Sequence, residues 1–391
     1  MEIRCNRIFL GKVLLFTIIL LVSGLGIFGC VGTGAVARGW SGGIVADSTL
    51  FLGSIEGEVV AVDISEGSVL WEVPLETSGQ AGGGFGCAPA ATTLAIYGTP
   101  AVSGDLVYVG GYNGKIYAIT SDSGALRWVY PREGSLDGSI VGGLVISQGK
   151  VYFGCSDGKL YALDAATGDK NWDFPTGDKI WSTPAIDGDT LFVTSFDKKL
   201  HAVDAATGKG KWEFDTAESD AGGAIISTPV VYNNTVYIGS FDRHLYAVDA
   251  TDGTQVWQFP VGDEVDNKPE SWFWAKPVIC DNTIYAGNLD GKVYILNAES
   301  GNEVVDAIDL GSPISSWPVL VDGSIIIASE DGRVWAIDTG NNQKSELTNL
   351  EQKIYAPLCA SDGVIYIHTQ KGILYEVDAQ TGATKQLYSI E

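Results

Sequence analysis

The sequence is poor in the residues that bind metals, haem and nucleotides. Its 391 residues include only three His and six Cys, and no two Cys are adjacent or separated by two residues. This spacing argues against a zinc site and against covalent haem attachment, and no Walker-type phosphate loop occurs. We therefore expect neither a metal site nor a catalytic residue. The three His lie at unrelated spacing and are interpreted as ordinary surface or half-buried residues: His201, His244 and His368.

Positive charge is also scarce. Lys and Arg number 24 against 48 Asp and Glu, which gives a net charge of −24. Such a surface repels nucleic-acid phosphates and anionic lipid head groups, so we expect no nucleic-acid partner. An acidic surface is either simply solvated or attracts a basic partner, and the composition leaves both open.

The N-terminal apolar run, Val13–Phe28, has only 16 residues and follows a basic start. A membrane-spanning helix needs about 20, so a signal peptide over residues 1–29 is the preferred interpretation, with an uncleaved anchor helix as the alternative. The run ends in Ile27-Phe28-Gly29-Cys30, which resembles a bacterial lipobox despite the bulky Phe28. We expect lipidation of Cys30, a tether over residues 30–39, and an extracytoplasmic, membrane-anchored protein. Disulfides form in such compartments, but pairing stays open for Cys87, Cys155, Cys280 and Cys359.

One phrase recurs through the rest of the chain. It reads Leu-Tyr-Ala-Leu-Asp-Ala-Ala-Thr-Gly at 160–168, is followed by Trp172, and returns at 200–208 and 245–253. Its eight copies recur on average every 45 residues, which is the period of a propeller blade. The Asp-equivalent positions are Asp63, Thr120, Asp164, Asp204, Asp249, Asn297, Asp338 and Asp378.

Each copy contains four short apolar segments separated by turn residues. In the fourth copy these are residues 184–186, 191–195, 199–203 and 211–214. Asn-Gly or Asp-Gly dipeptides such as Asp157-Gly158 separate the second and third segments and predict type I′ turns. The sequence therefore predicts an all-β, eight-bladed propeller of four-stranded antiparallel blades over residues 40–391, closed by side-chain packing between the first and last blades.

The spacing Asp-x-x-x-Gly-x-x-x-Trp has a structural explanation. Asp caps a turn, Gly adopts the positive φ that the turn needs, and the Trp ring on the outer strand packs on a neighbouring blade. The last three copies lack the Trp. The predicted blade-docking residues are Trp71, Trp128, Trp172, Trp212, Trp257, Gly168, Gly208 and Gly253.

With this motif the chain resembles the quinoprotein-like (PQQ-like repeat) propeller family, whose repeat reads A-x-D-x-x-T-G-x-x-x-W. The resemblance implies one of two classes: large dehydrogenases that use pyrroloquinoline quinone and calcium, or smaller propellers without the cofactor, such as the BamB-like lipoproteins. The absence of adjacent Cys and of long insertions favours the BamB-like branch. The resemblance therefore implies no quinone and no calcium, and a monomeric propeller.

Two segments depart from the repeat. Glu76–Ala95 is rich in small residues and predicts a mobile loop. Val261–Lys276 combines acidic and aromatic residues, which suits contact with a basic or extended partner; packing on the adjacent blade is the alternative. The candidate partner-binding residues are Asp263, Glu264, Asp266, Trp272, Phe273 and Trp274.

Aromatic residues also recur just before the first strand of several copies. They form either an apolar rim around one channel mouth or packing under the loops. These residues are Trp40, Tyr97, Trp181, Trp274, Trp317 and Tyr355.

Together these features predict a non-enzymatic interaction scaffold of the cell envelope that binds envelope proteins through loops or strand edges. Two alternatives remain: a quinoprotein-type oxidoreductase with a cofactor in the channel, and a receptor for sugars or other small ligands.

Overall fold

The structure is a computed structural model that describes residues 41–54, 56–75, 95–216, 223–261 and 268–389. The chain divides into two units, Met1–Val36 and Ala37–Glu391. The predicted signal peptide, Cys30, the tether and almost all of the Glu76–Ala95 segment lie outside the described residues. In the part of the chain that is described, no helix has the length and apolarity needed to span a membrane.

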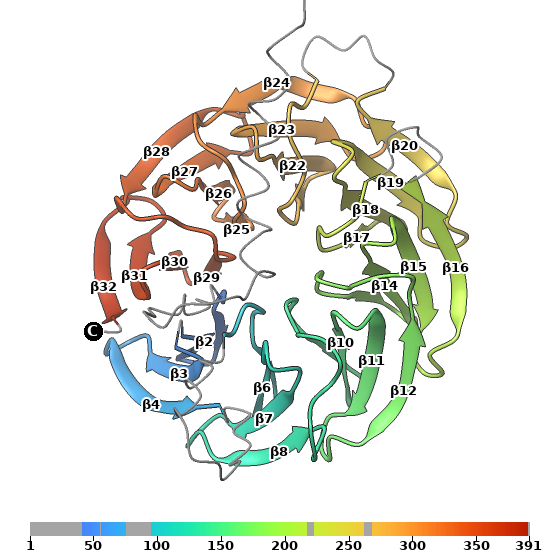
Figure 1. The fold of residues 1–391 in the computed structure, drawn as a ribbon. Coiled ribbons are helices and arrows are strands. Elements are labelled where there is room, and N and C mark those ends of the chain that lie inside the picture. Colours follow the sequence, from blue (N-terminus) through green and yellow to red (C-terminus); the bar gives the residue numbers. More distant parts are fainter. Residues whose placement is uncertain (1–40, 55, 76–94, 217–222, 262–267, 390–391) are drawn as a thin grey trace, which may run out of the picture. The chain divides into compact units, whose positions relative to one another are not determined.

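The second unit consists of eight four-stranded antiparallel sheets arranged as the blades of a propeller (Figure 1). Every blade is built from four consecutive strands, which confirms the predicted fold. Blades 1 and 2 comprise β1 (Ile44–Ala46), β2 (Thr49–Gly53), β3 (Glu58–Asp63), β4 (Ser68–Pro74), β5 (Ala101–Ser103), β6 (Leu106–Gly110), β7 (Ile116–Thr120) and β8 (Leu126–Tyr130). Blades 3 and 4 comprise β9 (Val145–Ser147), β10 (Lys150–Gly154), β11 (Lys159–Asp164), β12 (Lys170–Pro175), β13 (Ala185–Asp187), β14 (Thr190–Thr194), β15 (Lys199–Asp204) and β16 (Gly210–Asp215). Blades 5 and 6 comprise β17 (Val230–Tyr232), β18 (Thr235–Gly239), β19 (Leu245–Asp249), β20 (Gln255–Phe259), β21 (Val278–Cys280), β22 (Thr283–Gly287), β23 (Lys292–Asn297) and β24 (Glu303–Asp309). Blades 7 and 8 comprise β25 (Val319–Val321), β26 (Ser324–Ala328), β27 (Arg333–Asp338), β28 (Lys344–Asn349), β29 (Cys359–Ser361), β30 (Val364–His368), β31 (Ile373–Asp378) and β32 (Thr384–Ser389).

The hairpins between the second and third strands, here called the middle hairpins, differ from the prediction. In blade 3 the Gly158 N–H donates to the Cys155 carbonyl at 3.1 Å, and the Cys155 N–H donates to Lys159 at 3.0 Å. Gly158 has φ +82°, whereas Asp157 has no positive φ. This is a three-residue loop whose glycine follows a turn, so the predicted type I′ turn is wrong here because that turn needs positive φ at both central residues. Both central residues do have positive φ in several two-residue hairpins between first and second strands, at 148–149, 233–234, 281–282, 322–323 and 362–363.

The hydrophobic core is distributed between the blades. Eight clusters of buried side chains each join two neighbouring blades, such as Tyr152 and Leu160 of blade 3 with Leu191 and Val203 of blade 4. The eighth cluster joins blade 8 to blade 1. The middle strands of each blade read as nearly continuous apolar runs because both faces of each sheet are covered by neighbours.

The outer strands of blades 1 to 5 each carry a Trp that reaches the following blade. Trp128 Nε1 donates to the Ala165 carbonyl at 3.0 Å, and Trp257 Nε1 donates to Ala298 at 2.9 Å. The same bond runs from Trp71 to Ser121, from Trp172 to Ala205 and from Trp212 to Ala250, at 3.0–3.2 Å.

Each Trp ring lies over a glycine of the following blade that has a positive φ. A Cβ built on Gly208 would lie 2.6 Å from Trp172, and a Cβ on Gly168 would lie 2.6 Å from Trp128. These turn glycines are therefore needed twice, for the backbone conformation and for the close approach of the ring. They are Gly124, Gly168, Gly208, Gly253 and Gly301.

Blade 6 lacks the Trp, and the following blade differs accordingly. The turn-glycine position of blade 7 is Asn342, with φ +57°. Its side-chain oxygen accepts a hydrogen bond of 2.9 Å from the Tyr285 hydroxyl of blade 6. A side chain is tolerated at this turn because no indole ring covers it.

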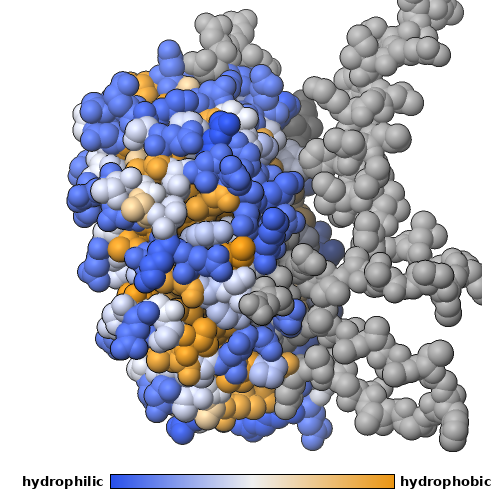
Figure 2. Space-filling view, turned by 90° about the vertical axis from the view of Figure 1, so that its left-hand side faces the viewer, coloured by the Kyte–Doolittle hydropathy of each residue, from blue (hydrophilic) through white to orange (hydrophobic). Residues whose placement is uncertain are grey.

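The outer strands of blades 7 and 8, β28 and β32, lie at the outer edge of the propeller (Figure 1). They present mostly hydrophilic side chains with hydrophobic ones between them (Figure 2).

The propeller closes by side-chain and loop contacts between blades 8 and 1. The Tyr388 hydroxyl of β32 donates to Glu72 Oε1 of β4 at 2.7 Å. His368, at the end of β30, is buried, and its Nδ1 lies 3.0 Å from the Ser41 carbonyl oxygen. The equivalent position in blade 3 is Gly154, where an added Cβ would lie 2.0 Å from Ile180 of the loop to blade 4. A larger side chain therefore occupies the closing interface.

The burial of His368 between blades 8 and 1 predicts that the stability of the propeller depends on pH. Burial lowers the pKa of His368 below its ordinary value of 6.5. As the pH falls below about 6.5, the unfolded chain binds a proton that the folded chain excludes, so stability should decrease. We expect the melting temperatures of wild type and His368→Gln to converge, or the variant to become the more stable, as the pH falls from 7.5 to 5.

Glu58 titrates in the same pH range. Its hydrogen bond with Glu72, together with burial, raises the pKa of Glu58 to about 7. The difference between the two proteins is therefore the informative quantity. Parallel pH profiles would show that His368 contributes nothing to the pH dependence.

Candidate interaction surface

The middle hairpins and the loops that link one blade to the next lie on the same face of the propeller, because both connect the same ends of the strands. A backbone hydrogen bond aligns them: the Phe196 N–H donates to Lys179 at 2.9 Å, and the Leu289 N–H donates to Trp272 at 3.1 Å. The residue after the acceptor is fully buried. It is Ile96, Ile140, Ile180, Ile225, Ile314 or Ile354 in six blade-linking loops and Phe273 in the seventh.

Phe273 is therefore a core residue. Its side chain is only 1% exposed and packs against Tyr294 of blade 6 with ring centroids 5.5 Å apart. It takes the place of the repeated Ile, so it cannot belong to an exposed binding surface as the sequence suggested. Asp263, Glu264 and Asp266 lie outside the described residues.

The two Trp residues beside Phe273 belong to a row of aromatic rings across three blades. Trp272 stacks on Phe241 with centroids 4.3 Å apart, and Trp274 lies 6.0 Å from the same ring. Phe241 contacts Phe196 at 6.4 Å, and Phe196 contacts Trp181 at 4.7 Å. All five side chains are partly exposed. We call Trp181, Phe196, Phe241, Trp272 and Trp274 the aromatic row.

The aromatic residues before the first strands pair with middle hairpins. Trp181 contacts Phe196, Trp274 contacts Phe241, and Tyr97 contacts Tyr112 of blade 2 at 5.4 Å. The Tyr355 ring lies beneath Lys353 Nζ at 5.9 Å. Trp317 lies two positions later in its loop than the others, and Trp40 lies outside the described residues. Trp181, Tyr97 and Trp274 thus each pack a blade-linking loop on a middle hairpin.

The middle hairpins of blades 4 and 5 carry cations where glycine is the rule. Lys198 and Arg243 have φ of +73° and +74°, and both side chains are exposed. Holding a non-glycine residue in this region costs about 1–2 kcal/mol. Strain of this kind accumulates at functional positions, and here it lies beside the aromatic row.

The carboxylates of the same two hairpins are turned inward. Asp197 Oδ2 lies 2.9 Å from His201 Nε2, and Asp242 Oδ2 accepts a hydrogen bond of 2.7 Å from Tyr246. Burial alone would raise the pKa of Asp242, but the bonds from His244 and Tyr246 outweigh it and hold the pKa below its usual value. Lys198 and Arg243 therefore place exposed positive charge next to the aromatic row, where the blade-linking loops also carry the exposed carboxylates of Asp178 and Glu270.

In other blades a Tyr hydroxyl donates a hydrogen bond to the carboxylate of the middle hairpin. Tyr161 donates to Asp157 at 2.6 Å, and Tyr294 donates to Asp290 at 2.8 Å. His201 takes this role in blade 4, so it has a structural explanation. The three His lie in blades 4, 5 and 8, and among the described residues no group of His, Cys, Asp and Glu has the arrangement of a metal site. Cys155, Cys280 and Cys359 are free thiols, and burial raises the pKa of Cys155 to about 12.

Comparison with known proteins shows which family the chain belongs to. The family model described as outer membrane protein assembly factor BamB matches residues 31–183 and 172–388. The chain belongs to this family. The resemblance seen in the repeat is thereby confirmed for the BamB family of PQQ-repeat propellers.

Solved structures share the fold of this BamB-family chain at low identity. BamB from Moraxella catarrhalis is 20% identical with a TM-score of 0.67, over 86% of this chain and 93% of that one. The computationally designed Ika8 protein is 16% identical with a TM-score of 0.70, over 87% and 96%. A europium-containing methanol dehydrogenase is 14% identical with a TM-score of 0.64, over 88% and 83%. No curated protein sequence matches the chain.

The sequence pattern of this BamB-family propeller did not indicate two of the five rings of the aromatic row. Phe196 and Phe241 each stand in a Ser-Phe-Asp triplet at the same place in adjacent copies, and each is followed by Lys198 or Arg243 instead of Gly. Aligning the middle hairpins would have exposed both departures.

Proposed function

We propose that this protein is a non-enzymatic scaffold of the cell envelope, tethered to a membrane by lipid on Cys30, which binds a protein partner through the aromatic row. Membership of the BamB family supports a role in protein interaction. The observation that carries the proposal is the row itself: five partly exposed rings in contact across blades 4 to 6, flanked by two exposed cations.

Such a surface has the composition of a binding site. Aromatic and Arg side chains are enriched at the energetic centres of protein interfaces. The rings are fixed by their mutual contacts, so little conformational entropy is lost when a partner covers them. The Phe241–Trp272 stack places its rings on a rigid hairpin and a blade-linking loop rather than on a free segment.

Substitution of Trp272 should separate binding from stability. Because Trp272 is partly exposed and stacks on one ring, Trp272→Ala is expected to cost about 1 kcal/mol of stability and to reduce partner capture from native membranes at least tenfold. The measurement pairs thermal melting with a crosslinking pull-down, normalised to folded protein.

Tyr112→Ala is the matched control, because Tyr112 belongs to an aromatic pair on the same face in blade 2 and is 48% exposed. We expect this control to leave capture unchanged. Equal capture by wild type and Trp272→Ala would contradict the proposal that the aromatic row is the binding surface.

The membrane tether is tested separately. Cys30→Ala should abolish lipid incorporation and block lipoprotein-type processing, because the thiol that would carry the lipid is then absent. Metabolic labelling with a radioactive fatty acid and N-terminal sequencing are the measurements. A mature protein that begins at Met1 would favour an uncleaved anchor, and labelling of the variant would show that Cys30 is not the lipidated residue; either result would contradict the lipid tether on Cys30.

A further inference from the structure

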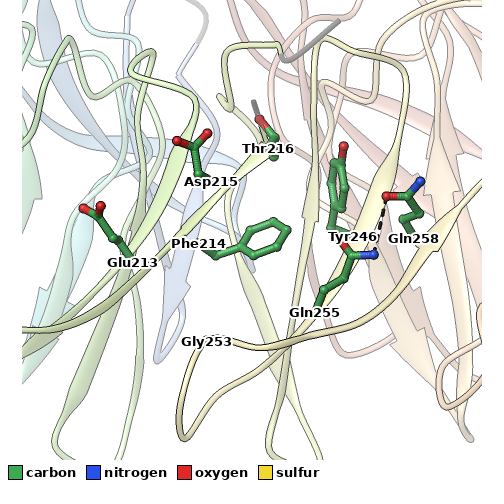
Figure 3. Close-up of a pocket in the computed structure, with 8 residues that line it drawn as sticks. All are labelled: Glu213, Phe214, Asp215, Thr216, Tyr246, Gly253, Gln255 and Gln258. Atoms are coloured by element: carbon green, nitrogen blue, oxygen red, sulfur yellow. Dashed lines mark hydrogen bonds between the residues drawn. The ribbon is translucent and has the colours of Figure 1, made fainter. Parts of the chain in front are cut away.

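A groove lies between the outer strands of blades 4 and 5. It encloses about 580 Å³ between β16 and β20 (Figure 3). Glu213 and Asp215 of β16 lie on one side, and Gln255 and Gln258 of β20 lie on the other. Between them the ring of Phe214 points toward Tyr246, with centroids 5.5 Å apart.

The groove coincides with a departure from the repeat. Outer strands with Trp carry Pro three positions later in blades 1, 2, 3 and 5, as in Trp172 and Pro175, whereas blade 4 has Asp215 at this position. The interface between blades 5 and 6 is filled at the corresponding position. There Phe259, the counterpart of Phe214, is 4% exposed and lies against Tyr294 of blade 6. A local break in a repeated pattern without a packing gain indicates a functional requirement.

The position facing Phe214 also differs from that in the preceding interface. Phe174 of blade 3 lies over Gly210, where an added Cβ would be 3.2 Å from its ring. Gln255 takes the register of Gly210 in blade 5, since Val248 pairs with Gln255 as Val203 pairs with Gly210. A polar amide thus replaces a bare backbone at the side of the groove.

The polar groups of the groove select a class of ligand. None of the described lining residues is cationic, which disfavours phosphates and carboxylates. Glu213 is already paired with Lys199 at 2.5 Å, so a cationic ligand gains little from it. The Gln255 and Gln258 side chains share one long bond of 3.4 Å, which a better partner would replace at small cost.

We propose that this groove binds a neutral, hydroxyl-rich ligand, specifically an oligosaccharide. Amide side chains both donate and accept hydrogen bonds, as sugar hydroxyls do, and the carboxylate oxygens add acceptors. The exposed part of the Phe214 ring offers an apolar face to the C–H groups of a sugar ring. A small number of polar groups around an aromatic surface is the usual composition of a small-ligand site. The proposal does not depend on the partner surface.

Saturation-transfer difference NMR with tetra-N-acetylchitotetraose and maltohexaose as probes tests the proposal. At least one saccharide should give saturable signals, and the double variant Gln255→Ala, Gln258→Ala should weaken binding about tenfold through two lost hydrogen bonds. Both Gln lie on an outer strand, so the variant should melt like wild type. Arg127→Ala, in the corresponding groove between blades 2 and 3, should bind like wild type.

Three results would overturn the proposal. The first is that neither saccharide binds, and the second is that the double Gln variant binds as well as wild type. The third is that a lysine hexapeptide displaces the saccharide and binds more tightly. The last result would make the groove a site for basic segments.

Discussion

Gly208→Asn is expected to destabilise the propeller by about 3 kcal/mol. Asn tolerates the positive φ of this turn, so the backbone is not the main obstacle. The new Cβ would lie 2.6 Å from the Trp172 ring, which must move and lose its 3.2 Å bond to Ala205. Overpacking of this kind costs about 1–3 kcal/mol, and the lost hydrogen bond adds about 1 kcal/mol. Urea unfolding followed by circular dichroism measures the change.

The chain contains its own control for this prediction. Asn342 occupies the same turn position in blade 7, where no Trp lies above it. Asn342→Gly should therefore change stability by no more than about 1 kcal/mol, the value of its bond to Tyr285. In addition, Gly208→Asn should cost much less when combined with Trp172→Ala, because the clash is then absent. Additive losses in the double variant would contradict the docking geometry.

Trp257→Ala should have a comparably large effect. The ring is only 8% exposed, lies 5.8 Å from Tyr237 and covers Gly301. Removing a large buried aromatic side chain costs about 3–5 kcal/mol. Trp128→Ala, at 9% exposure, should behave alike, whereas Trp212→Ala should cost less because its ring is only half-buried.

Trp257→Phe separates the hydrogen bond from the packing. It retains most of the ring contact but removes the indole N–H, and the Ala298 carbonyl still accepts the Tyr237 hydroxyl at 3.0 Å. We expect a loss of about 1–2 kcal/mol. If Trp257→Ala and Trp212→Ala were equally mild, the Trp rings would not be what holds neighbouring blades together.

The fold was predictable because its signals repeat along the chain. The Asp-Gly-Trp spacing returns in phase, and even the weak copies at Asn297 and Asp338 occupy the expected place in their blades. The fourth copy illustrates the accuracy: the expected third segment at 199–203 is β15, Lys199–Asp204. Repetition averages out the ambiguity of any single short strand.

The environments of individual residues could not be predicted in this way, because they depend on contacts between blades that the repeat pattern does not specify. Phe273 reads as an aromatic loop residue until its register with the buried Ile of the other blades is known. His368 is a strand residue whose burial arises only when blade 8 meets blade 1. The aromatic row forms because Phe196, Phe241 and Trp272, from separate copies, converge on one face.

Site-specific photo-crosslinking in native membranes tests the central claim most directly. A photoreactive phenylalanine analogue at position 241, in the middle of the aromatic row, should yield one discrete adduct with an envelope protein, and Trp272→Ala in the same chain should abolish it. The same analogue at position 112 in blade 2 should yield no such adduct. Equal adducts from both positions, or no adduct at 241 in lipid-tethered, folded protein, would contradict the proposal that this face of blades 4 to 6 holds the partner.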